Sequence, residues 1–375
     1  MQITRIGALS AIVLAGGLAL AGCASTPSTT PTDGSSPAPT SAASGLDAID
    51  PTLSGTITAG GSSAQVAAQN GYSAAFKSVA TGFTLNYNPE GSGGGRGHFI
   101  DGSYGFAGSD APLSADEVTK AAATYPDGAL DIPVYLDGVA VAYNNKDAST
   151  LNLSASTIAK IFSGAITDWS DPAIAADNGG TALPSKKITV VTRSDSSGTM
   201  QNFTNYLAGL AGSDWTAGAN LGQLPSIPGM DLQKGGAAVA TEIQAVDGAI
   251  GGVDHSALGD LVAASVDGVA LTNDGIANAM ATGFAIKPNA TPGDLSGAFD
   301  YAKIHADTTA YPIPLLSYAI IPAKFKDAST KDLVVAYLTF IASADGQKAG
   351  STAAKSVPLP DSILEQVNAT LATVK

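Results

Sequence analysis

The chain has 375 residues, of which 45% are hydrophobic and 13% charged, and this is enough for two domains with buried cores. Its formal net charge of −14 argues against nucleic acid or an anionic membrane surface as a partner. A small anion is not excluded, because short-range hydrogen bonds can hold it. The single cysteine excludes an intrachain disulfide, three histidines leave little for a metal site, and no P-loop or GxGxxG motif is present. We therefore expect no metal and no cofactor.

Residues 1–22 have the pattern of a secretory signal, with Arg5 before an apolar run that is too short to span a bilayer comfortably. The run ends in Leu-Ala-Gly followed by Cys23, which resembles the lipobox of bacterial lipoproteins, where the cysteine is lipidated. The alternative is an ordinary signal peptide with an incidental cysteine. Residues 23–50 are rich in Ser, Thr, Pro and Ala and predict a flexible tether. A lipid on Cys23 would hold the protein at the outer face of the cell membrane.

The folded part begins near residue 53 with three strands that each end in small, hydroxyl or acidic residues. These strands are predicted at residues 55–60, 83–87 and 105–108. The first is followed by Ser62, Ser63 and a helix that runs through Phe76. The second breaks into the glycine-rich stretch 90–95, and the third runs into a loop that carries Asp110. A glycine-rich loop alone is a weak signal, since most are simply turns.

A fourth junction is the most informative. An apolar, β-branched run at 188–192 ends in Arg193 and is followed by Ser197 and Thr199, after which helical spacing begins at Met200. The free N–H groups of the first helical turn and the helix dipole form a cradle for an anion, and the arginine adds a charged planar fork. The alternative is a capped helix start with a surface arginine.

Further along the chain, strands and helices alternate, which favours an α/β fold with mainly parallel sheets. Strands are predicted at 139–143, 249–253 and 318–321, a strand–helix pair at 269–282, and helices at 114–125, 156–162, 235–246, 331–343 and 362–373. Ser114 and Glu117 fit a capping box at the start of the first of these helices.

Three motifs give the chain a resemblance to a known family. AGSDAPLS at 107–114, KIFSGAITDWSDPAI at 160–174 and RSDSSGTMQNFTNYL at 193–207 resemble the signatures of PstS-type phosphate-binding proteins. These are substrate-binding lipoproteins of the bacterial phosphate ABC transporter, and the match covers residues 55–367. The resemblance implies a two-lobed, periplasmic-binding-protein-like (type II) fold with a ligand cleft between the lobes.

The implied lobe I is residues 51–142 plus 316–375, and the implied lobe II is residues 143–315. The hinge crossings would then fall near Tyr143 and residues 312–318. The segment 251–256 departs from the usual aromatic-containing form of the family, which we expect to affect packing more than binding.

The resemblance also implies the residues that bind phosphate. They are Ser63, Ala64, Ser92, Asp110, Arg193, Ser197, Gly198 and Thr199. Asp195 matches an acid that orients Arg193. The first motif reads AGGSSAQ and departs from the family form, so whether Ser62 or Ser63 faces the anion stays open.

Asp110 is an acceptor with no evident reason to face an anion unless the ligand carries a proton. The second ionisation of phosphate lies near neutrality, with a pKa of about 6 in phosphoesters, so monohydrogen phosphate can donate to a carboxylate. Sulfate has no proton and would leave a buried charge unpaired, which costs several kcal/mol. The residue type therefore predicts selection of phosphate over sulfate.

The expected function is non-catalytic: a monomer that captures inorganic phosphate and delivers it to membrane permease subunits of an ABC transporter. One alternative is a binding protein for a related oxyanion such as arsenate, sulfate or molybdate. The other is a secreted phosphatase, which would need a metal cluster or an activated nucleophile. The histidines are scattered and no GxSxG motif is present, which disfavours the enzyme.

Several other side chains have plain structural roles as the first expectation. Arg96 and His98 follow the glycine-rich stretch and are expected on a solvated helix face rather than at a ligand. His255 and His305 are expected to be packing or surface residues, and Trp169 a core residue.

Overall fold

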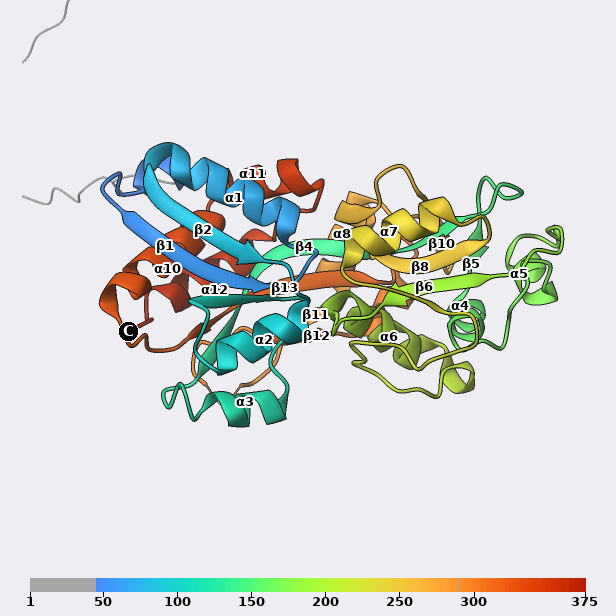
Figure 1. Ribbon diagram of the computed structural model, residues 1–375, viewed down its shortest axis with the longest axis horizontal. Coiled ribbons are helices and arrows are strands. Elements are labelled where there is room, and N and C mark those ends of the chain that lie inside the picture. The colour runs from blue at the N-terminus through green and yellow to red at the C-terminus, as the bar shows by residue number, and fades with distance from the viewer. Residues whose placement is uncertain (1–44, 290) are drawn as a thin grey trace, which may run out of the picture. The chain divides into compact units, whose positions relative to one another are not determined.

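The computed structural model describes residues 45–289 and 291–375, and one nine-stranded sheet extends through this region (Figure 1). The strand order is β2-β1-β3-β13-β4-β8-β6-β7, with β9 paired to β4. Strands alternate with helices along most of the chain, so the predicted α/β class is confirmed. The predicted signal peptide, Cys23 and most of the predicted tether lie outside the described residues.

Each half of the sheet contains three neighbouring parallel strands. In one half they are β1 (Ser54–Gly61), β2 (Gly82–Asn88) and β3 (Phe106–Ser109). In the other they are β6 (Thr189–Arg193), β7 (Asp231–Gln233) and β8 (Ala249–Asp254). The helices that follow these strands are α1 (Val66–Val79), α2 (Ser92–Ile100), α3 (Ala115–Ala121), α6 (Gly198–Leu210) and α7 (Gly236–Ala245). Parallel strands bring their carboxyl ends to one edge, where such helices begin.

Two long strands connect the halves, and all their pairings are antiparallel. They are β4 (Ala129–Asn144) and β13 (Pro314–Pro322), which pair with each other and with β3 on one side and β8 on the other. Apart from Asn144 every residue of both strands is buried, because helices and neighbouring strands cover both faces. The predicted hinge crossings near Tyr143 and residues 312–318 fall on these two strands.

The remaining elements are short strands and peripheral helices. The strands are β5 (Asn152–Leu153), β9 (Val262–Ala263), β10 (Ser265–Val266), β11 (Phe284–Ile286) and β12 (Gly297–Phe299). The α-helices are α4 (Ala155–Phe162), α5 (Pro172–Asp177), α8 (Asn273–Gly283), α9 (Tyr301–Ala306), α10 (Ala328–Ile341), α11 (Ala344–Ala354) and α12 (Asp361–Leu371). The 3-10 helices are η1 (Gly45–Ala48), η2 (Gly212–Asp214) and η3 (His255–Ala257).

Several predicted boundaries were wrong for identifiable reasons. The glycine-rich stretch is not a loop, because helix α2 begins within it at Ser92. Strand β4 is far longer than the predicted 139–143, since Asp131, Pro133 and Asp137 interrupt the apolar pattern on which the prediction rested. Helix α11 was missed altogether, because its residues are small or polar and include none of the large apolar side chains on which the other helix predictions rested.

The capping box was predicted correctly, and Ser114 and Glu117 make both of its hydrogen bonds. The helix ends at Ala121 instead of running to residue 125. At the other end of the chain, the part that the structure describes starts before the predicted end of the tether. There η1 lies against α11, where the Leu46 N–H donates to Asp345 Oδ2 at 3.0 Å, and Ile49 is buried.

Part of the segment assigned to lobe II packs against strands and helices of lobe I. The Asp131 N–H of β4 donates to Asp294 Oδ1 at 3.0 Å, and the Asp131 carbonyl accepts from the Leu295 N–H at 3.2 Å. The Thr370 hydroxyl of α12 donates to the Gly293 carbonyl at 3.0 Å. The loop between β11 and β12 therefore crosses from one half to the other, and the predicted lobe limits remain a prediction.

Trp169 is fully buried, as predicted for a core residue, and its indole N–H donates to the Gly248 carbonyl at 3.0 Å.

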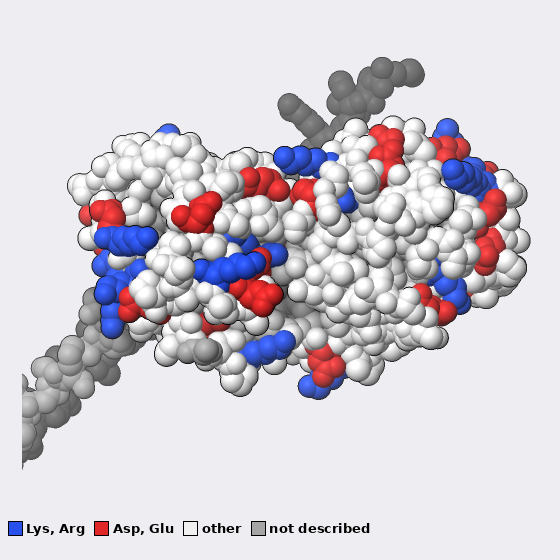
Figure 2. Space-filling model, turned by 60° about the horizontal axis from the view of Figure 1, so that its bottom comes forward, with Lys and Arg blue, Asp and Glu red and all other residues white. Residues whose placement is uncertain are grey.

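The face drawn in Figure 2 shows basic and acidic side chains interspersed, with no large area of one sign. No helix of residues 45–289 and 291–375 has the length and apolar composition of a membrane span.

A group of buried acids lies where β4 passes between the halves. Asp137 Oδ2 accepts from the Tyr135 hydroxyl at 2.9 Å and from the Ser256 N–H at 3.1 Å. Within the described residues, Asp137 Oδ1 has no hydrogen-bond partner and lies 3.6 Å from His255 Nδ1, and Asp254 Oδ1 is also unpartnered. Burial, and then the charge of Asp254, raise the pKa of Asp137 to about 7.

This arrangement predicts a pH-dependent stability. A carboxyl with a pKa of about 7 in the folded state and about 3.9 when unfolded holds a proton that the unfolded chain lacks. Its contribution to the free energy of unfolding therefore falls as pH rises from about 4 to about 7. Asp137→Asn should flatten this slope and stabilise the protein at pH ~8 by about 1–3 kcal/mol. Thermal unfolding of both proteins from acidic to mildly alkaline pH measures how the free energy of unfolding changes with pH. The exposed Asp260→Asn is the control, and an equal effect of Asp137→Asn at pH ~5 and ~8 would contradict the prediction.

Candidate functional site

The ends of β1, β3 and β6 and the start of α2 meet where the two halves of the sheet face each other. The closeness is visible at Gly198, the first residue of α6. A Cβ atom there would lie 2.5 Å from Ser92 Oγ and 2.7 Å from Asp110 Cβ. Only glycine permits this approach without moving Ser92 or Asp110. The junctions that the sequence analysis singled out therefore form one site, drawn from both halves.

The Asp110 carboxylate is the most heavily hydrogen-bonded group of the site. Its Oδ1 accepts from the hydroxyls of Ser62 at 2.5 Å and Ser317 at 2.6 Å, and its Oδ2 accepts from the Ser92 hydroxyl at 3.2 Å. The side chain is buried. Burial raises the pKa of Asp110, although the three hydroxyls and the charge of Arg193 act in the opposite direction. The result is a buried acceptor group beside a guanidinium.

Arg193 is buried and held in place by Asp195. Its Nε donates to Asp195 Oδ1 at 2.7 Å and its Nη2 donates to Asp195 Oδ2, while the Gly235 N–H donates to Oδ1 at 3.1 Å. Burial by itself would raise the pKa of Asp195, but these donors and the arginine charge lower it below its ordinary value. Among the described residues Nη1 makes no hydrogen bond, so one edge of the planar fork remains available to a ligand.

The start of α6 supplies further donors. Ser197 is the N-cap residue, and its Oγ accepts from the Met200 N–H at 3.2 Å. The Thr199 hydroxyl is buried and has no hydrogen-bond partner within the described part of the chain. A buried hydroxyl without a partner costs about 1–3 kcal/mol. Together with the helix dipole of α6, it indicates a site built to receive an anion.

The structure places the two serines of the first motif differently. Ser62 is buried and bonded to Asp110, and its Oγ also accepts from the Ala64 N–H at 3.1 Å. The Ser63 hydroxyl points to the other half, where its Oγ accepts from the Gly236 N–H at 3.2 Å. Ser62 therefore lies nearer to Asp110 than the predicted ligand Ser63.

Several hydrogen bonds join the two halves across the site. The Gly93 N–H donates to the Ser196 carbonyl at 3.0 Å, and Asn202 Nδ2 donates to the Asp110 carbonyl at 2.6 Å. Gly91, whose φ is 93°, lies so close to Asp195 that a Cβ would fall 2.2 Å from Oδ2. The start of α2 thus faces the start of α6.

Arg96 does not lie on a solvated helix face, so that expectation was wrong. It is buried, its Nε pairs with Glu117 Oε1 at 2.9 Å, and its Nη1 donates to Ser109 Oγ at 2.9 Å and to Gln201 Oε1 at 3.3 Å. The last of these bonds crosses between the halves. The adjacent His98 is half exposed, as expected for the outer face of α2.

Sequence reasoning missed two residues of this site. Ser317 was the single serine in the buried, mostly apolar run 315–321, and that isolation was the available signal. Asn202 carried no signal, because its contact with Asp110 joins positions far apart in the chain. Across residues 45–289 and 291–375, no group of three His, Cys, Asp or Glu side chains is placed to hold a metal ion.

Comparison with known proteins agrees with the geometry. The family description of the PBP superfamily domain matches residues 46–345. The phosphate-binding protein PstS2 of Mycobacterium bovis is 33% identical over 390 residues, covering 96% of each chain. The phosphate-binding protein PstS of Xylella fastidiosa is 32% identical over 303 residues, covering 78% of each chain.

The fold is shared with solved structures as well. The phosphate-binding protein of Stenotrophomonas maltophilia superposes with a TM-score of 0.64 at 20% identity, covering 84% of this chain and 94% of that one. The two-lobed fold expected from the motifs is therefore confirmed, and the protein belongs to the PstS phosphate-binding protein family of the PBP superfamily.

Proposed function

We propose that this protein captures inorganic phosphate between its two lobes and delivers it to the permease subunits of an ABC transporter. The observation that carries the proposal is one site in which a buried carboxyl, a buried guanidinium and the start of α6 converge. The relatives reported above are named as phosphate-binding proteins. We call this site, formed by Ser62, Ser92, Asp110, Arg193 and residues 197–199, the cradle. It offers hydrogen-bond donors to the oxygens of a tetrahedral anion and one acceptor for a protonated oxygen.

The proposed ligands divide by the half that contributes them. From the first half come Ser92, Asp110 and the serine motif with Ser63, Ala64 and the nearer Ser62. From the second come Arg193, Ser197, Gly198 and Thr199, with Asp195 orienting the arginine. Because ligand contacts come from both halves, phosphate would favour the arrangement in which the lobes meet.

The proposed role is binding without catalysis. A serine nucleophile needs a general base, but within the described residues the hydroxyls of Ser62, Ser92 and Ser317 donate to the Asp110 carboxylate and none bonds to a histidine. In the described part of the chain, His98 lies beside Glu90 and Asp101, His255 beside Asp137, and His305 beside Asp267. None of these is a neighbour of the cradle hydroxyls.

We also propose that the protein acts as a monomer outside the cytoplasm, anchored by a lipid on Cys23. The lipobox-like sequence that ends in Cys23 is the support for the lipid anchor and for the location. Cells grown with labelled palmitate should yield labelled protein, and Cys23→Ala should abolish the label and release the protein from the membrane fraction. Label that survives this substitution would contradict the anchor.

Thr199→Val tests the cradle at its unpartnered hydroxyl. Valine has nearly the same shape, and no hydrogen bond to this hydroxyl within the described residues would be lost. We expect unchanged thermal stability and phosphate binding weakened by about tenfold to a hundredfold, the value of a hydrogen bond to a charged group. Isothermal titration with phosphate measures this.

The matched control for that test is Thr241→Val on the exposed side of α7, whose hydroxyl bonds within its own helix to Ala237. It should leave phosphate affinity unchanged. Full affinity in Thr199→Val would exclude the Thr199 hydroxyl as a phosphate ligand.

Asp110→Asn tests selection between phosphate and sulfate. The carboxylate accepts a hydrogen bond from the protonated oxygen of monohydrogen phosphate, whereas an amide has a donor that sulfate can use. We expect the ratio of phosphate to sulfate affinity to fall by at least about a hundredfold, from the cost of an unpaired buried charge that sulfate no longer meets. Titrations with both anions near pH 7 measure the ratio.

Thermal unfolding should first establish that Asp110→Asn is folded, because three serine hydroxyls donate to this side chain. An unchanged ratio of phosphate to sulfate affinity in a folded variant would exclude Asp110 as the acceptor for the protonated oxygen of phosphate. Equal binding of both anions by the unmodified protein would leave an oxyanion carrier without this selectivity.

A further inference from the structure

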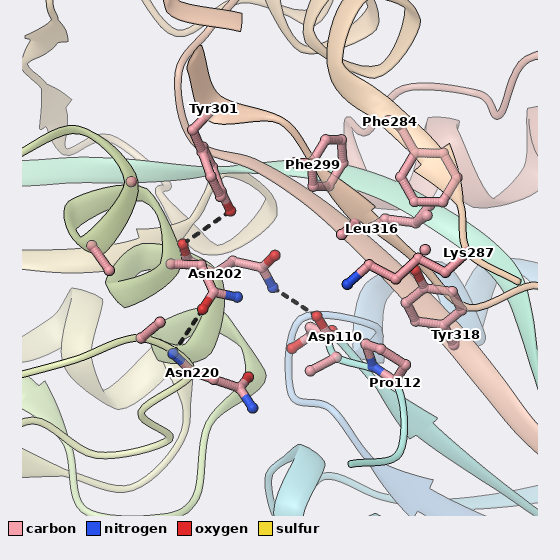
Figure 3. Close-up of a pocket in the computed structure, with 17 residues that line it drawn as sticks. Asp110, Pro112, Asn202, Asn220, Phe284, Lys287, Phe299, Tyr301, Leu316 and Tyr318 are labelled. Carbon is pink, nitrogen blue, oxygen red and sulfur yellow. Dashed lines mark hydrogen bonds between the residues drawn. The ribbon is translucent and has the colours of Figure 1, made fainter. Parts of the chain in front are cut away.

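A cavity of about 510 Å³ lies directly beside the cradle (Figure 3). Residues from both halves line it: Pro112 and Tyr318 on one side, and Asn202 and Asn220 on the other. Asp110 belongs to both the cavity wall and the cradle. Asn202 separates the two spaces, because its Nδ2 donates to the carbonyls of Asp110 at 2.6 Å and Gly198 at 3.0 Å.

Among the described residues that line this cavity, Lys287 is the only cation. In Figure 3 its side chain extends into the cavity, with the ammonium directed toward Asn202 and Asp110. Within the described residues no carboxylate lies within 4.0 Å of it, in contrast to Arg193 and Arg96. Those two charges are largely cancelled by Asp195 and Glu117, so they attract a distant anion only weakly.

The rest of the lining adds little charge. Phe284, Phe299, Tyr301 and Tyr318 supply ring surfaces, and Asn205 and Asn220 supply amides. Walls of low polarity focus the field of a single cation. The Asp110 carboxylate is the one acidic group among the described lining residues, and it accepts hydrogen bonds from the hydroxyls of Ser62, Ser92 and Ser317.

We propose that this cavity is a capture site for inorganic oxyanions, in which Lys287 draws phosphate from solution to the Asn202–Asp110 contact before it enters the cradle. A chain with a formal net charge of −14 repels anions at long range and needs a local attraction of this kind. The site is wide and offers one ammonium and few amide donors, so it holds phosphate only briefly. The inference rests on the proposed function and adds the route by which the ligand arrives.

The expected consequence is kinetic. Lys287 acts before the anion reaches the cradle, so its charge should change the association rate constant and leave the dissociation rate constant unchanged. Lys287→Met should slow association about three- to tenfold at low ionic strength, and Lys287→Glu should slow it further. The difference should vanish at about 0.5 M salt, where surface charges are screened. Lys287→Arg should keep the normal rate.

The experiment uses the whole protein and ³²P-labelled inorganic phosphate. Chasing the labelled complex with unlabelled phosphate gives the dissociation rate constant, equilibrium dialysis gives Kd, and their ratio gives the association rate constant. Lys120→Met is the control. Lys120 is an exposed lysine of α3 that forms no ion pair within the described residues, and its substitution changes the net charge by the same amount.

Slower association in the Met and Glu variants, with normal dissociation and a normal control, supports the capture site. Unchanged association, a change confined to dissociation, or an equal effect of Lys120→Met overturns it. If the unmodified protein does not bind phosphate, the proposed function fails and the capture site fails with it. If the unmodified protein binds phosphate and the Lys287 variants associate normally, only the capture site fails.

Discussion

The arrangement around Asp110 depends on a carboxyl group being kept in the interior. Burial raises the free energy of its ionised form, and three serine hydroxyls and the nearby arginine lower it again. Ser62 directly follows β1, Ser92 is the first residue of α2, and Ser317 comes from the strand β13 that runs between the halves. The hydrogen bonds to this one side chain therefore require the end of β1, the start of α2 and the middle of β13 to lie close together.

The same requirement links the cradle to the sheet. Parallel strands within each half bring Asp110 and Arg193 to edges that face one another, while the antiparallel strands β4 and β13 hold the two edges together. Because β4 and β13 are almost entirely buried, their path is fixed by packing on both faces. The hydrogen bonds between the halves, such as Asn202 to Asp110, are then formed between groups that the sheet has already brought close.

The charges near the site are paired locally. Arg193 is bound to Asp195 from the same turn, and Arg96 is bound to Glu117 from the capping box of α3. Pairing holds each guanidinium in a fixed position, which favours directional hydrogen bonds over long-range attraction. Asp137 and Asp254 are buried, each with one oxygen that has no partner among residues 45–289 and 291–375, and burial raises the pKa of both carboxyls, so protons are also part of the charge balance there.

The sequence by itself determined the class of fold and most of the chemistry of the candidate site. Local signals were sufficient there: strands that end in hydroxyl and acidic residues, the capping box at Ser114, and the motif from Arg193 to Thr199. These features depend on neighbours within a few residues, so they can be recognised in one stretch of chain. The arginine motif in particular places a strand end, a charge and a helix start in a fixed order.

Only the tertiary structure decided which distant groups meet. The contacts of Ser317 and Asn202 with Asp110, and of Arg96 with Gln201, join positions that no local pattern connects. The same holds for the orientation of Ser62 and Ser63, which depends on whether each hydroxyl faces its own half or the other. The length of β4 was also hidden, because polar residues within it are satisfied by neighbours from elsewhere in the chain, such as Tyr135 and Ser256 at Asp137. Periodicity reads which side chains are apolar, whereas burial of a polar side chain depends on partners that only the folded chain supplies.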